Sequence, residues 1–202
     1  MRLVTWNCNG ALRKKLNAAD ALNADVLIVQ ECEDPARSTP QYRHWAGDYL
    51  WVGENKNKGI GIFPKNKNIV RRLDWFGSFC IPGLHTTSQF HREQLKSENT
   101  IIAGDFNSNA IWDKEDRWWS HSDTVKELEL LGLHSLYHAK TGECQGQESI
   151  PTFFHQRNPR KPYHIDYVFI SDNLLESSSL EVGAIGDWLE FSDHAPLVAN
   201  ID

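Results

Sequence analysis

The sequence predicts a single α/β domain with mixed β-sheets. Strand-like hydrophobic runs alternate with helical segments, and several of the runs are separated by short polar turns that suit hairpins. The chain has 202 residues, of which 40% are hydrophobic and 24% charged, a globular composition at a length that buries a substantial core. It contains no internal repeat and no linker, so we expect one domain over residues 1–202.

The N-terminal part predicts a strand, a helix and a second strand. Residues 3–7 are an apolar run, and residues 11–24 carry apolar side chains at helical spacing with basic side chains on the opposite face. The run VLIVQE follows at residues 26–31. A strand–helix–strand order implies that the two strands are parallel neighbours with a right-handed crossover.

The remaining elements follow from the same patterns. We expect strands at residues 59–63, 68–81, 100–105, 164–170 and 196–201, and helices at residues 88–97 and 122–133. Ser, Asp and Thr are available to cap the second of these helices, and Gly132 lies near its end.

Net charge and cysteine content narrow the partners and the cellular location that we expect for this protein. The net charge is −6 and the pI is about 5.8, which argues against a protein that holds long duplex nucleic acid mainly by phosphate contacts. Carboxylates clustered around a metal would account for part of this charge, so nucleic acid is not excluded. The four cysteines are scattered without zinc spacing, no targeting segment precedes the first strand, and no apolar run is long enough to span a membrane. We therefore expect a cytoplasmic protein with reduced thiols and no membrane partner.

Polar side chains end five of the strand-like runs. Groups at the ends of buried strands, or in the loops beyond them, can gather at one edge of a sheet. Four carboxylates, two amides and one imidazole gathered in this way would suit a hard cation with an acid–base partner. The residues are Asn7, Glu31, Asp105, Asn107, Asp166, Asp193 and His194.

Three of these residues show how the functional interpretation competes with a structural one. Glu31 ends an apolar strand, where a carboxylate is costly to bury unless it meets a cation, but a structural ion pair would serve equally well. Asp105 and Asn107 are ordinary turn residues when taken singly. Together they could orient a water molecule and hold a phosphate oxygen.

The carboxylates expected near His194 favour a functional role for its imidazole. A single histidine is usually structural, but His194 adjoins Asp193, and Asp166 on another strand could hold its ring nitrogen. An imidazole held in this way can shuttle a proton or stabilise charge that develops on a phosphate.

Five motifs in order, WNCNG, QE at residues 30–31, GDFN, IDYVFIS and SDHAPLV, extend from Trp6 to Val198. Together they resemble the endonuclease/exonuclease/phosphatase family, which includes exonuclease III-like and DNase I-like enzymes. The resemblance implies a four-layered α/β sandwich, in which two packed mixed sheets are flanked by helices. It also implies cleavage of phosphate esters with Mg²⁺ or Mn²⁺ as cofactor.

The resemblance assigns a role to each matched residue. Glu31 resembles the principal metal ligand, Asn7 the amide beside it, and Asp193 a second carboxylate on the metal side. The other four matched residues resemble the groups that act on water and phosphate. Asp105 positions the attacking water, Asn107 holds water and phosphate, and His194 is the catalytic imidazole, which Asp166 orients.

The middle of the chain departs from the family pattern. The family has two strands and a helix here, but residues 64–104 have room for one strand and one helix, so we expect a central strand to be missing. His85 could replace the phosphate contact that this strand would supply, although we favour a plain loop histidine at a shortened junction. A lost strand would weaken turnover and expose a sheet edge, through which two chains could pair as a homodimer.

The substrate class follows less directly. His155 and Arg157 belong to a basic stretch ahead of residues 164–170 and could clamp a phosphodiester backbone, or could form a solvated basic loop. Trp118 and Trp119 could stack on exposed bases, although packing is the simpler role. We favour a nuclease acting on DNA or RNA. The alternatives are a phosphatase or phosphodiesterase for a small metabolite, and a weakly active member that binds nucleic acid or protein.

Overall fold

The computed structural model describes residues 1–66, 68–72, 91–116 and 119–202. Its strands are β1 (Arg2–Asn7), β2 (Val26–Cys32), β3 (Leu50–Asn55), β4 (Lys58–Pro64), β5 (Ile101–Asp105), β6 (Leu133–Ser135), β7 (Phe153–Phe154), β8 (Pro162–Tyr163), β9 (Asp166–Ser171), β10 (Ser179–Val182) and β11 (Leu197–Asn200). Its α-helices are α1 (Leu16–Ala21), α2 (Pro40–Ala46), α4 (Arg92–Leu95), α5 (His121–Leu130), α6 (Leu136–Thr141), α7 (Asp172–Leu175) and α8 (Ile185–Trp188). Single 3₁₀ turns are η1 (Leu12–Lys14), η2 (Pro35–Arg37), η3 (Ala110–Trp112) and η4 (His155–Arg157).

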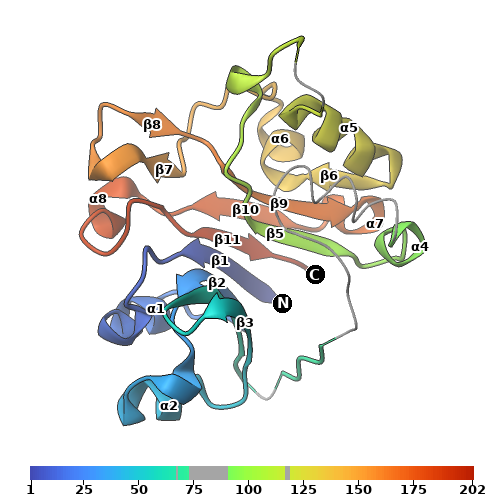
Figure 1. The fold of residues 1–202 in the computed structure, drawn as a ribbon. Helices are drawn as coiled ribbons and strands as arrows, with labels where there is room; N and C mark the ends of the chain where they lie inside the picture. The colour runs from blue at the N-terminus through green and yellow to red at the C-terminus, as the bar shows by residue number, and fades with distance from the viewer. Residues whose placement is uncertain (67, 73–90, 117–118) are drawn as a thin grey trace.

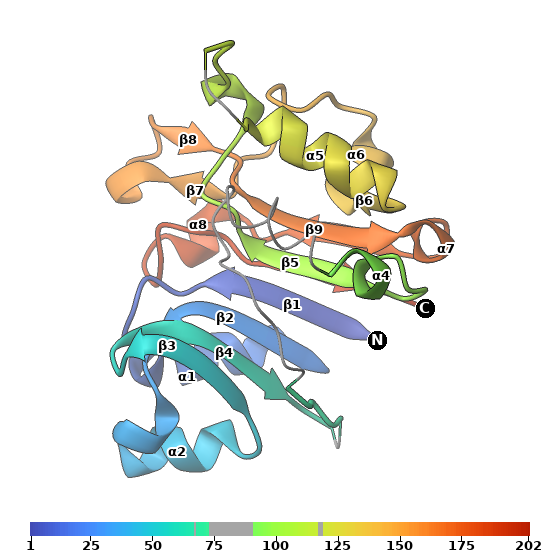
Figure 2. The same ribbon diagram turned by 45° about the vertical axis from the view of Figure 1, so that its right-hand side comes forward.

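Two sheets pack face to face at the centre of the molecule (Figures 1 and 2). The larger sheet has the order β10-β11-β1-β2-β4-β3, and the smaller has the order β5-β9-β6. β1 and β2 are parallel, as the strand–helix–strand order predicts, and the other pairs are antiparallel. Because side chains alternate along a strand, Leu3 of β1 faces the second sheet, whereas Val4 and Trp6 face the helices beneath the first.

Three apolar clusters separate four layers. One joins β1 and β2 to α1 and α2, one lies between the two sheets, and one joins β5 and β9 to α5. The views in Figures 1 and 2 show α1 and α2 below the larger sheet and α5 and α6 above the smaller one. The expected α/β sandwich is therefore confirmed. The expected missing strand concerns residues 64–104, of which residues 67 and 73–90 lie outside the described residues, so it stays a prediction.

The expected single helix over residues 11–24 is wrong. The chain instead forms η1 and α1, which are separated at Lys15 (φ −126°). The carboxylate of Glu33 accepts hydrogen bonds from the backbone of Leu12 (2.8 Å) and Arg13 (3.2 Å), and the ammonium of Lys15 donates to the carbonyls of Cys8 and Gly10. These contacts tie the segment to the ends of β1 and β2 and override its helical periodicity.

The other helices follow the sequence more closely. α5 begins with the capping box of Ser120 and Asp123, and the chain leaves it through Gly132, whose φ of +75° favours glycine. Of the expected helix at residues 88–97, the described part contains α4. Among the helices described, none is both long and apolar enough to cross a bilayer.

Candidate active site

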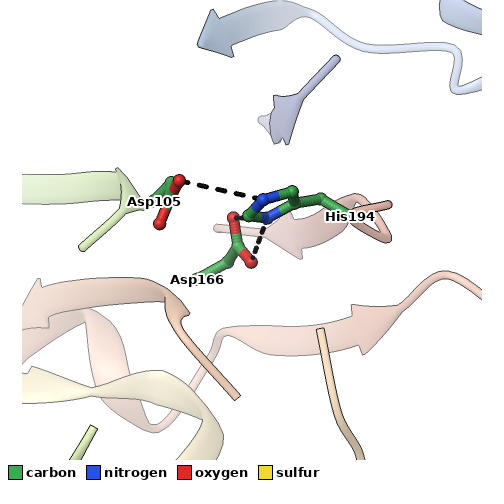
Figure 3. Close-up of side chains that lie close together, drawn as sticks. All are labelled: Asp105, Asp166 and His194. Atoms are coloured by element: carbon green, nitrogen blue, oxygen red, sulfur yellow. Dashed lines mark hydrogen bonds and ion pairs between the residues drawn. The ribbon is translucent and has the colours of Figure 1, made fainter. Parts of the chain in front are cut away.

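The end of β5 and the start of β9 bring two carboxylates together. Asp105 and Asp166 are directly opposite each other in the antiparallel β5–β9 pair. Both side chains are almost fully buried, with 4% and 3% of their surface exposed. Two like charges in a buried site repel each other, so this arrangement needs a compensating cation. Figure 3 shows His194 reaching toward both carboxylates.

His194 is the cationic partner of this pair. Its Nδ1 lies 2.9 Å from Oδ2 of Asp166, and its Nε2 lies 3.9 Å from Oδ2 of Asp105 (Figure 3). Burial lowers the pKa of His194, but the charge and hydrogen bond of Asp166 outweigh burial and raise this pKa to about 9. The ring is therefore protonated at neutral pH and donates from Nδ1 to Asp166.

Asp105 has hydrogen-bond donors on both oxygens. The side-chain amide of Asn7 donates to Oδ2 (2.9 Å), and the backbone N–H of Asn107 donates to Oδ1 (2.8 Å). Burial and the charge of Asp166 raise the pKa of Asp105 to about 6, against the opposing effects of His194 and the two donors. Asn7 is thus linked to the carboxylate pair through Asp105.

Thr152 fixes the position of Asp166, and the sequence did not single it out. Its hydroxyl donates to Oδ2 of Asp166 (2.7 Å) and accepts hydrogen bonds from the backbone N–H groups of Ile165 and Asp166 (3.1 Å each). The residue is fully buried. It lies just before β7 without a motif that would mark it, and its role depends on a contact between separate segments.

The loop that carries His194 is tied to β1. The hydroxyl of Ser192 donates to the carbonyl of Asn7 (2.7 Å) and accepts from the backbone N–H of His194 (3.0 Å). The indole of Trp6 donates to the carbonyl of His194 (3.1 Å). These bonds hold the imidazole in register with the end of β1.

Glu31 and Asp193 lie outside this buried group. Glu31 occupies a bulge at the end of β2, with φ of +60°, and forms an ion pair with Lys58 (2.7 Å). Bulges commonly redirect a side chain next to a functional site. Asp193 accepts a hydrogen bond from the side chain of Asn9 (2.8 Å).

The structure describes only some of the residues that were expected to bind substrate. His155 and Arg157 are exposed in η4, where the Arg157 guanidinium donates to the carbonyls of Glu190 (3.1 Å) and Phe191 (3.2 Å). Asn107 is also exposed. His85 and Trp118 lie outside the described residues, and Trp119 is half-buried.

The described residues contain one group of at least three possible metal-ligating side chains. Asp105, Asp166 and His194 offer ligand atoms that all lie within 4.8 Å of one another. Because His194 already binds Asp166 through Nδ1, we interpret these three residues as a hydrogen-bonded unit rather than as a set of metal ligands. They are the candidate for catalysis, and for that reason we call them the catalytic triad below.

Comparisons with known proteins give a family and a fold. The sequence profile of the endonuclease/exonuclease/phosphatase family matches residues 4–194. None of the curated protein sequences compared matches the chain.

Three solved structures have similar folds. A 3′–5′ exonuclease from Neisseria meningitidis is 18% identical with a TM-score of 0.72, and the match covers 100% of both chains. A structure described as a 3′ phosphatase from Neisseria bound to product DNA hairpin is 20% identical with a TM-score of 0.73, covering 100% of this chain and 99% of that one. An AP endonuclease from Archaeoglobus fulgidus is 17% identical with a TM-score of 0.66, again covering 100% and 99%.

Proposed function

Because the chain belongs to the endonuclease/exonuclease/phosphatase family, we propose that it is a divalent-metal-dependent phosphodiesterase that hydrolyses DNA or RNA. The observation that carries this proposal is the catalytic triad, in which a buried imidazolium faces two carboxylates. Such a group can act on a phosphate and a water molecule at the same time.

His194 supplies positive charge and a proton at Nε2. With Nδ1 donating to Asp166, Nε2–H is directed toward Asp105 and is free to donate to a phosphate oxygen. The 3.9 Å between Nε2 and Oδ2 of Asp105 exceeds hydrogen-bond length, so one oxygen beside the line that joins these atoms can hydrogen-bond to both. Asp166 keeps the ring charged and oriented.

Asp105 orients the attacking water and accepts its proton. Its pKa of about 6 leaves it mainly ionised at neutral pH, yet makes it a stronger base than an ordinary aspartate. The donors from Asn7 and Asn107 hold the carboxylate in place, and the exposed side chain of Asn107 is available to a phosphate oxygen.

The residues at the ends of β1 and β2 fit a hard cation. Glu31 shares its ion pair with Lys58, whose side chain is 61% exposed, and an exposed pair of this kind is weak enough for a divalent ion to displace. Asn7 lies opposite Gln30, the residue before Glu31. We assign Mg²⁺ or Mn²⁺ to Glu31 with Asn7 and Asp193; when bound, it neutralises phosphate charge as a Lewis acid.

The metal assignment has a readout that does not depend on activity. Calorimetric titration with Mn²⁺ should show at least a tenfold weaker affinity for Glu31→Gln than for the unaltered protein, because the main anionic ligand is lost. Lys58→Gln removes the competing cation and should bind equally well or more tightly. Equal affinity for Glu31→Gln and the unaltered protein would contradict the assignment.

Hydrolysis is tested by offering the protein a panel of labelled substrates. The panel contains single-stranded, duplex and abasic DNA, RNA, a 3′-phosphorylated oligonucleotide and a small phosphodiester, each with Mg²⁺, Mn²⁺ or EDTA. We expect metal-dependent cleavage of a nucleic acid that His194→Ala abolishes. His134→Ala is the matched control, because His134 forms a surface ion pair with Asp172 (2.7 Å). Binding without cleavage under every metal condition would contradict the proposal and favour a binding role.

A terminal phosphate is a second candidate substrate. The fold is similar to a structure described as a 3′ phosphatase bound to product DNA hairpin. Release of inorganic phosphate from the 3′-phosphorylated oligonucleotide, with the internal bonds left intact, would favour this activity over a nuclease. Hydrolysis of the small phosphodiester alone, to an alcohol and a phosphomonoester, would instead favour a metabolite enzyme, which the net charge of −6 suits.

Pairing of two chains through a sheet edge is a separate proposal. Among the described strands, β5 lies at one edge of the smaller sheet, next to the segment of the chain that was expected to lack a strand. Edge strands present unpaired backbone groups that another chain can pair with. A strictly monomeric mass by light scattering at high protein concentration would contradict a dimer.

A further inference from the structure

A row of aromatic rings leads from the catalytic imidazole to the surface. The ring of His194 lies 4.5 Å from that of Phe153, Phe153 stacks on Tyr163 at 6.3 Å, and Tyr163 lies 5.1 Å from Trp112. Phe153 and Tyr163 are half-buried and pair across the short β7–β8 hairpin. The far end of the row, Trp112, is exposed.

Trp112 is more exposed than is usual for a tryptophan. It retains 41% of its accessible surface, and the neighbouring Ile111 retains 52%. Two neighbouring large apolar side chains exposed at the surface are more informative than single ones, because they indicate a binding surface.

The turn that carries Trp112 is held rigidly. The side-chain oxygen of Asn109 caps η3 by accepting from the backbone N–H of Ile111 (3.0 Å). Its side-chain amide donates to the carbonyl of His164 (2.8 Å) and to the hydroxyl of Tyr167 (3.1 Å). Only 2% of Asn109 is exposed, so the turn that contains Trp112 is held by a buried polar side chain. A preordered ring loses little conformational entropy when a ligand stacks on it.

The segment beside the row carries positive charge. Residues 155–163 include Arg157, Arg160 and Lys161, all exposed, and contain no acidic residue. Aromatic rings next to basic side chains are the combination that binds single-stranded nucleic acid, because bases stack on the rings and phosphates meet the cations. The aromatic row is continuous with the catalytic triad, so a strand bound there would reach His194.

We propose that Trp112, supported by Tyr163, stacks on an unpaired base of the nucleic-acid strand whose phosphate lies at His194. The inference rests on the proposed function and adds a substrate class to it. In a continuous duplex both faces of each base are covered by neighbouring bases, so the ring can stack only on a base at an end, in a gap or in a single strand. The preferred substrates are therefore frayed or single-stranded near the cleaved bond.

The test separates base stacking from phosphate binding by removing one partner at a time. Two fluorescently labelled single-stranded oligonucleotides of equal length are used, one with normal bases and one with an abasic tetrahydrofuran residue at every position. Affinity is measured in EDTA, where no cleavage occurs, for the unaltered protein and for Trp112→Ala. Leu130→Ala on α5 is the control, because Leu130 is a comparably exposed apolar residue outside the row.

Stacking predicts a loss that depends on the base. Trp112→Ala should weaken binding of the base-bearing oligonucleotide roughly 5- to 150-fold and leave binding of the abasic one unchanged. Trp112→Phe should recover part of the loss, and Leu130→Ala should cause none. An equal loss for both oligonucleotides, or no loss for either, would overturn the inference. If the thermal unfolding midpoint shows that Trp112→Ala does not fold, Trp112→Phe takes its place. A smaller ring should then weaken binding of the base-bearing oligonucleotide and leave binding of the abasic one unchanged.

Cleavage distinguishes this inference from the proposed function. With Mg²⁺, the unaltered protein should prefer a frayed end over a blunt duplex, and Trp112→Ala should lose that preference while it retains metal-dependent cleavage. Base-dependent binding without any cleavage would overturn the proposed function but support the stacking surface. Cleavage that is equal on frayed and blunt ends would overturn the stacking surface and leave the proposed function standing.

Discussion

Two regions among the described residues contain buried histidine side chains that face different groups. In the catalytic triad, His194 faces the carboxylates of Asp166 and Asp105. In a second group, His121, His138 and His164 pack around the ring of Tyr167, at 5.2, 6.3 and 5.1 Å between ring centroids. We call this second group the histidine cluster.

The hydrogen-bond partners of the histidine cluster are mainly neutral. His121 bonds to the hydroxyl of Ser108 (2.7 Å), and His164 bonds through Nδ1 to the carbonyl of Ile150 (2.8 Å). Burial lowers the pKa of both His121 and His164 and outweighs the nearby charges that raise it. Both rings are therefore neutral at neutral pH.

The comparison shows that burial alone does not set the charge of an imidazole. Burial lowers the pKa in both regions, but in the catalytic triad a directly bonded carboxylate reverses the effect. His164 and Asp166 are two residues apart, so one short segment contributes to both regions. We infer that the triad is organised for chemistry and the histidine cluster for support of the loop after β5.

The largest expected difference between the regions is in activity. His194→Ala should lower kcat/KM roughly 10²- to 10⁴-fold, because it removes the proton donor and positive charge at the phosphate. His138→Ala, in the histidine cluster, should leave kcat per folded molecule unchanged. Steady-state kinetics on the best substrate of the panel compares them. Similar losses in the two variants would show that the regions do not divide chemistry from support.

The next largest effect is on stability, and we expect it in the histidine cluster rather than in the catalytic triad. Burial raises the pKa of Glu148, but hydrogen bonds from His138, the backbone of Gly146 and Asn109 lower it to about 2. Its side chain is only 4% exposed and bonds to His138 at 3.1 Å. Glu148→Ala should therefore lower the free energy of unfolding by about 3–5 kcal/mol, because it leaves buried donors without a partner.

Urea denaturation measures this loss, with Asp172→Ala as the control. Asp172 also pairs with a histidine, His134, but its side chain is 71% exposed, so its removal should cost only about 0–1 kcal/mol. Equal losses for the two variants would mean that the buried carboxylate does not support the histidine cluster.

Thr152 should contribute both to stability and to catalysis. Thr152→Val keeps the shape of the side chain but leaves the backbone N–H groups of Ile165 and Asp166 without an acceptor. It should cost about 1–3 kcal/mol of unfolding free energy and also lower kcat, because Asp166 loses a hydrogen-bond donor. Thr152→Ser should restore both properties, as measured by denaturation and kinetics on the same preparations. Lost stability with unchanged kcat would show that Asp166 is positioned without Thr152.

The residues of the triad carry a stronger signal in the sequence than their supports do. Asp105 ends β5, Asp166 begins β9 and His194 lies shortly before β11, and strand periodicity is a strong local signal. Thr152 and Asn109 form hydrogen bonds to segments that are distant in the sequence, and no local sequence pattern predicts such bonds. The same limitation explains η1 and α1, where the carboxylate of Glu33 divides a segment that is helical by periodicity.

The sequence also did not single out Trp112. The sequence drew attention to Trp118 and Trp119, because an adjacent pair is conspicuous, whereas Trp112 follows an ordinary turn. What distinguishes Trp112 is exposure combined with a ring contact to Tyr163 from the β7–β8 hairpin. Exposure depends on what the rest of the chain covers, and composition does not reveal that.

The pH dependence of stability should also distinguish the two regions, because they act on it with opposite signs. His121 and His164 have folded-state pKa values below the ordinary value of 6.5, so the unfolded chain binds more protons there. Their contribution to stability is therefore present above about pH 6.5 and is lost as the pH falls below it. The folded-state pKa of His194 is about 9, so its contribution is present below pH 6.5 and is lost as the pH rises through 9.

Unfolding measured in EDTA between pH 5 and 9.5 separates these contributions. One group changes the slope by at most about 1.4 kcal/mol per pH unit. His194→Gln should flatten the decline between pH 6.5 and 9, and His121→Gln should change the slope only below about 6.5. Asp105, with a pKa raised to about 6, adds a decline between about pH 4 and 6, which is common to the unaltered protein and His121→Gln and so cancels in their difference. A decline above pH 6.5 that persists in His194→Gln would show that the imidazolium is not stabilised by Asp166, and the distinction between the two regions would then fail.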